Sequence, residues 1–286
     1  MVLDPKIMGI LNVTPDSFSD GGRFFTLDDA VKQALQMSEE GADIIDVGGE
    51  SSRPGAEPVS TEEELHRVIP VIRELRRQSK IALSIDTTKS LIAARAIEAG
   101  ATMINDISAG LGDPEMFAVA AQFSVPICLM HMQGKPKTMQ NNPQYKDVVA
   151  EVKAFLAGRI AAAAKAGIAK EKIIVDPGIG FGKRLEDNIA LLQHCDRFVE
   201  LGCPVLIGAS RKSFIGQITG APVQDRLPGS LAAVAVAAQK GAKIFRVHDI
   251  AATRQFLSVF SLTRPDQSRD TLSHRGRGVN KEGNLS

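Results

Sequence analysis

A short pattern that recurs along the chain constrains its fold more than any other feature. In each copy, a glycine and an alanine precede a mainly apolar run of strand length that ends on a polar side chain. Three copies cover residues 41–46, 100–105 and 241–246, and a looser fourth ends in the run 173–176. Glycine suits the position just after a helix, because the left-handed backbone conformation costs it little. The repeat therefore predicts helices that alternate with buried strands, and a polar group at the end of each strand.

Further apolar runs between these copies complete a set of eight expected strands. They cover residues 6–12, 43–48, 81–86, 102–107, 126–131, 173–176, 204–208 and 243–248. The intervening segments are typical of helices; Thr26, for example, precedes a helical pattern with Ala30, Val31, Ala34 and Met37 on one face. Strands that alternate with helices form a parallel sheet. Eight such units in 286 residues favour a single α/β domain of the (β/α)8, or TIM-barrel, class over a doubly wound sheet.

The expected barrel covers residues 1–263. Residues 264–286 show no amphipathic period and are expected to form a flexible tail. The connections after the first two strands, residues 12–22 and 48–56, are long and rich in Ser, Thr, Gly and Pro. We expect them to act as mobile lids over a substrate, although solvated loops without a function remain the alternative.

The balance of charge excludes some classes of function. A net charge of +1 with 44% hydrophobic residues is typical of a globular protein and argues against a nucleic-acid surface, which needs a concentrated basic face. No apolar run is long enough to span a membrane. The three cysteines lack CxxC spacing, and Cys128 is expected to be a buried thiol. We expect a reduced, cytoplasmic protein.

Polar residues end most of the expected strands. They are Asn12, Asp46, Asp86, Asn105, Asp106, His131, Asp176, Arg246 and His248. In a barrel of this class, the catalytic groups lie at the carboxyl ends of the strands. Carboxylates and amides match the edge of a nitrogen heterocycle, and the cationic groups of Arg53, Lys212, Arg246 and His248 suit phosphate oxygens. The residues predict a heterocycle at the barrel floor and a phosphate toward the rim.

Three familiar motifs are absent. Residues 178–183 resemble a phosphate-binding loop, but Pro177 stands at its first glycine position and Arg184 replaces the Ser or Thr. The five histidines show no HExxH or paired spacing, which argues against a zinc site. No GxSxG sequence supports acyl transfer.

Eight motifs, in this order, resemble the dihydropteroate synthase family. They are NVTPDSFSDGG, DVGGESSRPGA, SIDTTK, INDISAG, LMHMQGKPKTMQ, DPGIGFGK, GASRKSFIG and RVHDI, and the resemblance runs from residue 6 to residue 260. It implies the condensation of 6-hydroxymethyl-7,8-dihydropterin pyrophosphate with p-aminobenzoate to give 7,8-dihydropteroate and pyrophosphate. It also implies competition by sulfonamides for the p-aminobenzoate position, and a homodimer.

The same resemblance implies roles for individual residues. The pterin would contact Asp86, Asn105, Ile107, Met130, Asp176 and Lys212. The pyrophosphate would contact Asn12, Arg246 and His248, and Asn12 would also ligate Mg²⁺. The p-aminobenzoate site would comprise Ser52, Arg53, Pro54, Phe181 and Ser213, and Asp16 would close onto the metal or the pyrophosphate. The catalytic residues among these would be Asp16, Arg53, Asp86, Asp176 and Lys212.

The expected chemistry uses no activated nucleophile and no obvious general base. Both absences suit a reaction in which the C–O bond to pyrophosphate breaks first and a carboxylate such as Asp86 or Asp176 offsets the charge of the pterin-methyl cation. One alternative is a pterin-binding methyltransferase, against which the two lids and the cationic residues favour a pyrophosphate substrate. A catalytically silent pterin-binding paralogue is the other, and Arg53 and His248 argue against it.

Overall fold

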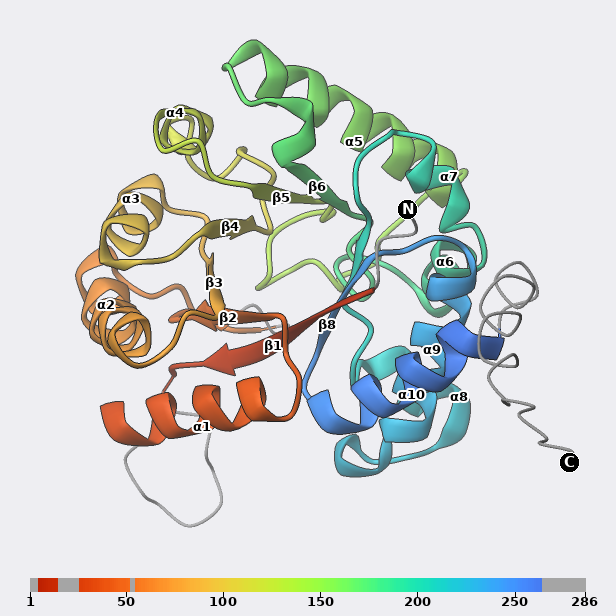
Figure 1. The fold of residues 1–286 in the computed structure, drawn as a ribbon. Coiled ribbons are helices and arrows are strands. Elements are labelled where there is room, and N and C mark those ends of the chain that lie inside the picture. The colour runs from red at the N-terminus through yellow and green to blue at the C-terminus, as the bar shows by residue number, and fades with distance from the viewer. Residues whose placement is uncertain (1–4, 15–25, 52–54, 264–286) are drawn as a thin grey trace, which may run out of the picture.

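Eight parallel strands form a nearly closed barrel in the computed structural model, which describes residues 5–14, 26–51 and 55–263 (Figure 1). The strands are β1 (Lys6–Asn12), β2 (Ile44–Gly48), β3 (Ala82–Asp86), β4 (Met103–Asp106), β5 (Ile127–Met130), β6 (Ile173–Asp176), β7 (Leu206–Ile207) and β8 (Ile244–Val247). Hydrogen-bonded neighbours follow the order β6-β5-β4-β3-β2-β1-β8-β7. A bridge between Val175 and Val205 joins the two ends of this order. The predicted α/β barrel is therefore confirmed.

The last strand in this order, β7, is shorter than the sequence predicts. It has two residues, whereas the expected run covered 204–208. Pro204 has no N–H group to continue a ladder, although its carbonyl accepts a hydrogen bond from the Val175 amide at 3.0 Å. The seam between β6 and β7 thus contains fewer paired residues than the other junctions of the described barrel.

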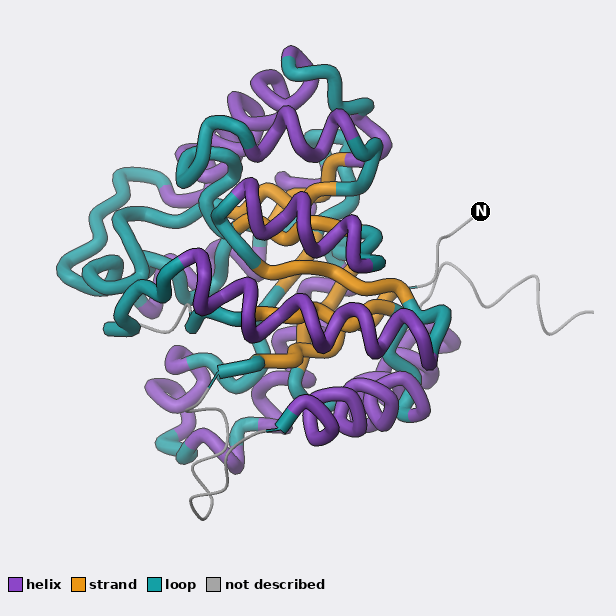
Figure 2. The backbone as a smooth tube through the Cα atoms, turned by 90° about the vertical axis from the view of Figure 1, so that its left-hand side faces the viewer, coloured by secondary structure: helices purple, strands orange, loops and turns teal. Residues whose placement is uncertain are grey.

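Helices surround the strands, as Figure 2 shows from the side. The described α-helices are α1 (Leu27–Glu39), α2 (Thr61–Gln78), α3 (Ser90–Ala99), α4 (Met116–Gln122), α5 (Val148–Lys165), α6 (Leu185–Gln193), α7 (Asp196–Val199), α8 (Ser213–Thr219), α9 (Leu227–Gln239) and α10 (Ile250–Thr263), with 3-10 turns η2 (Lys170–Lys172) and η3 (Val223–Asp225). Thr26 caps α1 through a reciprocal pair of bonds with Asp29. The predicted stripe of Ala30, Val31, Ala34 and Met37 is buried.

Glycines end the helices that precede the repeated pattern, as predicted. Gly41, Gly100 and Gly241 have φ values of 100°, 120° and 96°. A side chain would be strained in this left-handed region of backbone space. The recurring glycine thus marks the point where each helix stops and turns into the next strand.

The strands present different residues to the helices and to the barrel interior, because successive side chains point to opposite sides. Leu11 packs with the helices, whereas Met8 belongs to an inner apolar cluster. That cluster consists of Met8, Met103, Cys128, Ile174, Leu206 and Ile244. Two residues further along their strands come Asn105, Asp176 and Arg246. The apolar cluster is therefore the floor beneath a layer of polar side chains.

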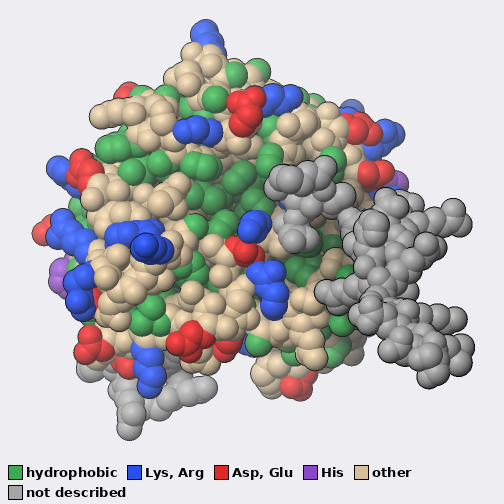
Figure 3. All heavy atoms as spheres, in the orientation of Figure 1, with side chains coloured by type: hydrophobic (Ala, Val, Ile, Leu, Met, Phe, Trp, Pro, Cys, Tyr) green, Lys and Arg blue, Asp and Glu red, His purple; other side chains and the backbone are tan. Residues whose placement is uncertain are grey.

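The cysteines are buried, and the surface carries charges of both signs. Cys128, Cys195 and Cys203 are buried free thiols, which confirms the expectation for Cys128. On the face shown in Figure 3, Lys and Arg side chains intermingle with Asp and Glu, and hydrophobic side chains gather over the upper half. Within the described ranges, no helix has the length and apolarity to cross a bilayer.

Candidate active site

The carboxyl ends of neighbouring strands bring several predicted residues side by side. Asn12 of β1 lies opposite Gly48 of β2, Gly48 lies opposite Asp86 of β3, and Asp86 lies opposite Asn105 of β4. A Cβ atom built on Gly48 would lie 3.6 Å from Asp86 Oδ2 and 3.8 Å from Asn12 Oδ1. Glycine at this position therefore keeps open a space that both oxygens border.

Arg246 of β8 crosses the barrel interior and joins two carboxylates. Its Nε donates to Asp46 Oδ2 at 2.6 Å, and its Nη2 donates to Asp86 Oδ2 at 2.7 Å. Asn105 Nδ2 donates to the same Asp46 oxygen at 2.9 Å. This network fixes the side chains of Asp86 and Asn105, which were both predicted to hold the pterin. Arg246 contacts one predicted pterin residue here, Asp86, and its predicted contact with pyrophosphate stays a prediction.

Asp46 was predicted to lie at a strand end, but no role was predicted for it. Asp46 is completely buried, and its Oδ1 has no hydrogen-bond partner among the described residues. The two-residue period of β2 could have revealed it, because Gly48 and Asp46 share the inward face. Asp46 is best described as the buried anchor of Asn105 and Arg246.

Burial makes ionisation of the site carboxyls unfavourable. It raises the pKa of Asp86 to about 7, against the opposing charge of Arg246 and with a further contribution from Asp46. Burial also raises the pKa of Asp176, although Lys212 opposes the rise. Asp176 Oδ1 accepts a hydrogen bond from the Gly178 amide at 2.7 Å. Both carboxyls can therefore change protonation nearer to neutral pH than an exposed aspartate.

Lys212, which follows β7, faces the loop after β6. Burial lowers the pKa of Lys212 to about 7, although the carboxylate of Asp176 opposes the change. Its Nζ donates to the carbonyl of Ile179 and lies 4.3 Å from the centroid of the Phe181 ring. The structure thus brings together one predicted pterin residue, Lys212, and one predicted p-aminobenzoate residue, Phe181.

The remaining described candidates lie around this centre. Met130 is 3% exposed beside Asp176 in the sheet. His248 lies 3.0 Å from Ser210 through its Nδ1. Ser213 is the exposed first residue of α8. These positions surround the polar layer, and the roles predicted for them stay predictions.

Asp106 ends β4 and His131 directly follows β5, but both face away from the polar layer. Asp106 Oδ1 accepts from the Ser108 amide at 2.8 Å and Oδ2 from the Gly110 amide, which holds the turn after β4. The His131 ring packs edge-on against Phe155 of α5, with centroids 4.8 Å apart. Strand-end position alone therefore did not identify a site residue; the inward face was also required.

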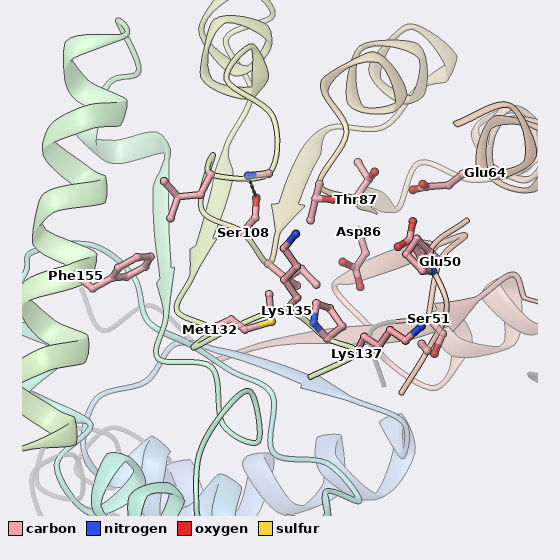
Figure 4. Close-up of a pocket in the computed structure, with 18 residues that line it drawn as sticks. Glu50, Ser51, Glu64, Asp86, Thr87, Ser108, Met132, Lys135, Lys137 and Phe155 are labelled. Atoms are coloured by element: carbon pink, nitrogen blue, oxygen red, sulfur yellow. Dashed lines mark hydrogen bonds between the residues drawn. The ribbon is translucent and has the colours of Figure 1, made fainter. Parts of the chain in front are cut away.

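A cavity of about 470 Å³ opens next to Asp86. The residues labelled in Figure 4 come from the end of β3, from the loops after β2, β3, β4 and β5, and from α2 and α5. Asp86 points toward the space between them. Ile107, a predicted pterin contact, also lines this cavity. Its volume suits a small-molecule ligand. The predicted residues Asp16, Ser52, Arg53 and Pro54, and both predicted lid tips, lie outside the described residues.

The described residues offer few protein ligands for a metal. In the ranges that the structure describes, no three His, Cys, Asp or Glu side chains form a metal-binding group. Mg²⁺ usually takes one or two protein oxygens and completes its shell with phosphate oxygens and water. The Asn12 amide oxygen, which borders the open space at Gly48, is a suitable oxygen of this kind. Asn12 therefore fits the small number of protein oxygens that Mg²⁺ takes.

Comparison with known proteins identifies the family. Residues 8–248 match the model of a family described as pterin binding enzyme. A dihydropteroate synthase of Haemophilus influenzae is 51% identical over 259 residues, which cover 91% of this chain and 94% of the relative. The chain belongs to the dihydropteroate synthase family.

Solved structures of the family agree with the fold. The Xanthomonas albilineans enzyme with 4-aminobenzoic acid superposes with a TM-score of 0.85 at 52% identity, covering 90% of this chain and 92% of that one. The same organism's enzyme in complex with 7,8-dihydropteroate gives a TM-score of 0.82 at 48% identity, covering 91% and 94%. The predicted family, its transferase class and its role in folate biosynthesis are confirmed.

A lysine of one family motif links the loop after β2 to the start of α3. Lys89 of SIDTTK bonds Glu50 Oε2 and Glu64 Oε2, both at 2.6 Å, and the carbonyl of Val59 at 2.7 Å. Glu64 is 1% exposed, so its charge depends on this partner. Lys89 therefore ties both ends of the connection between β2 and α2 to the start of α3.

Proposed function

We propose that this chain condenses 6-hydroxymethyl-7,8-dihydropterin pyrophosphate with p-aminobenzoate, releasing pyrophosphate. The observation that carries the proposal is the polar layer above the barrel floor, where Asp86, Asn105 and Asp176 face inward around Arg246 and Lys212. Relatives of about half identity are named for this activity. A family structure contains the arylamine and another contains the product.

The pterin would bind through the inward-facing carboxylates and amide. A pterin presents N–H groups and ring nitrogens along one edge, which suit carboxylate acceptors and an amide that can donate and accept. Asn105 Nδ2 already donates to Asp46. This bond fixes the orientation of the Asn105 amide, and its oxygen would accept a hydrogen bond from the pterin. Met130 and Ile107 would supply apolar contact to the ring faces.

The first chemical step would break the C–O bond to pyrophosphate and leave a positive charge on the pterin-methyl group. Asp86 and Asp176 would offset this charge in a site with little water. Lys212 has a pKa of about 7, so its neutral form opposes the developing cation less than an ordinary lysine would. The amine of p-aminobenzoate then attacks the methyl carbon, and Asp86 and Lys212 can hold the proton that the nitrogen loses.

Arg246, His248 and Asn12 would hold the pyrophosphate group. Cationic donors stabilise the charge that builds on the departing oxygens. When bound, Mg²⁺ would neutralise part of that charge, with Asn12 as its protein ligand. Phe181, Ser213, Ser52, Arg53 and Pro54 would form the p-aminobenzoate site, and Asp16 would close over the pyrophosphate.

The proposal is tested by following pyrophosphate and dihydropteroate together, with each substrate and Mg²⁺ omitted in turn. We expect product only when both substrates are present, dependence on Mg²⁺, and inhibition by a sulfonamide that p-aminobenzoate relieves. Pterin binding without product would instead indicate a silent paralogue. Turnover that requires a methyl-folate would indicate a methyltransferase.

The raised pKa of Asp86 predicts how pterin binding depends on pH. The affinity for 6-hydroxymethylpterin, which lacks phosphate, is expected to fall about tenfold for each pH unit below about 7. The carboxyl is protonated below its pKa, and it then loses the charge that accepts the pterin N–H groups. Calorimetry between about pH 5.5 and 8 measures this change. Asp86→Asn should bind weakly and with a shallower dependence on pH, because only Asp176 and Lys212 would still titrate near the pterin. A wild-type profile as shallow as that of Asp86→Asn would contradict the assignment.

The cellular location and the oligomeric state also remain proposals. We propose a cytoplasmic homodimer, on the basis of the resemblance and of the reduced, buried cysteines. Light scattering during size-exclusion chromatography measures the oligomeric state directly, and a mass equal to one chain would exclude the dimer.

A further inference from the structure

Side chains hold the backbone carbonyls of the glycine-rich part of the loop after β6. Across residues 178–182, Lys183 bonds the carbonyls of Gly178 and Phe181 at 2.9 and 3.0 Å. The other three carbonyls are held by Lys212 at Ile179, by Gln140 at Gly180 and by Tyr145 at Gly182. A loop with this many side-chain partners is fixed in one conformation. Among these partners, Lys183 alone bonds the loop at two points.

Lys183 also connects the loop to the end of β5. Its Nζ lies 3.0 Å from His131 Nδ1 and 3.3 Å from the His131 carbonyl. Burial lowers the pKa of Lys183 to about 7. Its ammonium form can only donate, so with that form Nδ1 is the acceptor and the imidazole is neutral with its proton on Nε2. Burial, together with the charge of Lys183, lowers the pKa of His131 to about 3, which agrees with this form. Lys183 is itself 3% exposed.

The backbone of the loop after β6 packs closely against the residues that follow β5. A Cβ atom on Gly178 would lie 1.9 Å from the His131 carbonyl oxygen, and one on Gly182 would lie 2.4 Å from the Gln133 carbonyl oxygen. Both glycines have positive φ, at 70° and 60°. Lys183 Nζ occupies the junction where these backbone segments meet and lies within hydrogen-bond distance of the Gly178, Phe181 and His131 carbonyls.

Two predicted substrate residues depend on this loop. Phe181 belongs to it, and Lys212 bonds its Ile179 carbonyl and faces the Phe181 ring. Asp86 and Asn105, by contrast, stand on β3 and β4 and are held by Arg246 and Asp46. Lys212 and Asp176, two further predicted pterin residues, also bond the loop. A loss of loop order should still affect the arylamine more than the pterin, because Phe181 belongs to the loop whereas Asp86 and Asn105 keep their partners outside it.

We propose that Lys183 is a positioning residue that holds Phe181 for the arylamine by tying the loop after β6 to the end of β5. This role rests on the proposed condensation of a pterin with an arylamine. Lys183 does not touch substrate; it acts through the backbone carbonyls that it bonds. The lysine of the glycine-rich stretch is thus used for internal order and not for phosphate.

The test replaces Lys183 with Met, which keeps an apolar chain of similar length but removes the donors. We expect the KM for p-aminobenzoate to rise about tenfold or more, and the affinity for 6-hydroxymethylpterin, measured by calorimetry, to change less than about threefold. Amide hydrogen exchange of residues 178–182 should accelerate while that of β3 and β4 stays unchanged. The exchange measurement reports loop order without any need for turnover.

Matched controls separate this role from a general loss of stability. Lys172→Met removes a surface lysine that bonds the Ser124 carbonyl, and it should leave both substrate parameters unchanged. Tyr145→Phe removes one bond from the same loop at Gly182 and should raise the KM for p-aminobenzoate less than Lys183→Met does.

Three outcomes would overturn the inference. They are an unchanged KM for p-aminobenzoate in folded Lys183→Met, an equal loss of pterin and arylamine affinity, and unchanged exchange in the loop. If Lys183→Met does not fold, Lys183→Gln retains two shorter-reaching donors and is judged by the same criteria. If the wild type forms no dihydropteroate, the proposed function fails, and loop exchange in the variants still decides whether Lys183 orders the loop.

Discussion

Asp86→Asn is expected to slow turnover by about a thousandfold or more while the barrel still folds. The substitution keeps the size of the side chain and removes the charge that would accept the pterin and offset the cation. It also places an amide where Arg246 Nη2 now donates at 2.7 Å. Arg246 keeps its bond to Asp46 at 2.6 Å, so the buried guanidinium retains a counterion. Steady-state kinetics with both substrates, together with circular dichroism, measure the effect.

Asp106→Asn is the matched control for this prediction. Asp106 follows Asn105 on the neighbouring strand, but its carboxylate faces the turn after β4 and bonds Ser108 and Gly110. We expect near-normal turnover from this variant, with some loss of stability. If Asp86→Asn were as active as Asp106→Asn, the electrostatic role of Asp86 would be wrong.

Arg246→Met is expected to cause the largest loss of stability among the site substitutions. It would leave the buried carboxylate of Asp46, and Asp86 beside it, without their counterion. Breaking one partner from a buried pair costs about 3–5 kcal/mol. For a domain of this size, such a loss corresponds to a fall in Tm of about 10 °C. Differential scanning calorimetry near neutral pH measures the change, and turnover should also be lost.

A second substitution checks the cause of this instability. Asp46→Asn removes the buried charge that Arg246 neutralises, while its amide oxygen can still accept from Asn105. The double variant Asp46→Asn with Arg246→Met should therefore be more stable than Arg246→Met alone. A double variant that is less stable would show that packing, and not the unpaired charge, dominates.

Much of the fold could be predicted because each βα unit carries its own local signals. The glycines at 41, 100 and 241 end helices, the apolar runs that follow are too short for helices, and Thr26 marks a helix start. The length of β7 could not be read in this way. Its apolar run is typical of a longer strand, but Pro204 and the packing at the seam restrict its pairing to two residues.

The site was predicted in part, and the missing part depends on contacts between distant residues. Asn12, Asp86, Asn105 and Asp176 could be found because strand ends in this fold point to one place. The bond between Arg246 and Asp46 joins residues 200 positions apart, so only closure of the barrel reveals it. Lys183 illustrates a different limit, since its motif resembles a phosphate-binding loop but its side chain turns inward onto carbonyls.

The sparse pairing between β6 and β7 means that a bound substrate would help to hold these two strands together. Across the described strands the ladder runs from β6 through β1 to β7, and the isolated pairing of Val175 with Val205 closes the circle. Asp176 ends the strand on one side of this seam, and Lys212 follows the strand on the other. A pterin bound by both residues would link β6 and β7 across the junction that has the fewest backbone pairs in the described barrel. Without ligand, local opening of the barrel would then occur mainly between β6 and β7, next to the pterin site. Pterin binding would oppose this opening and stabilise the folded barrel.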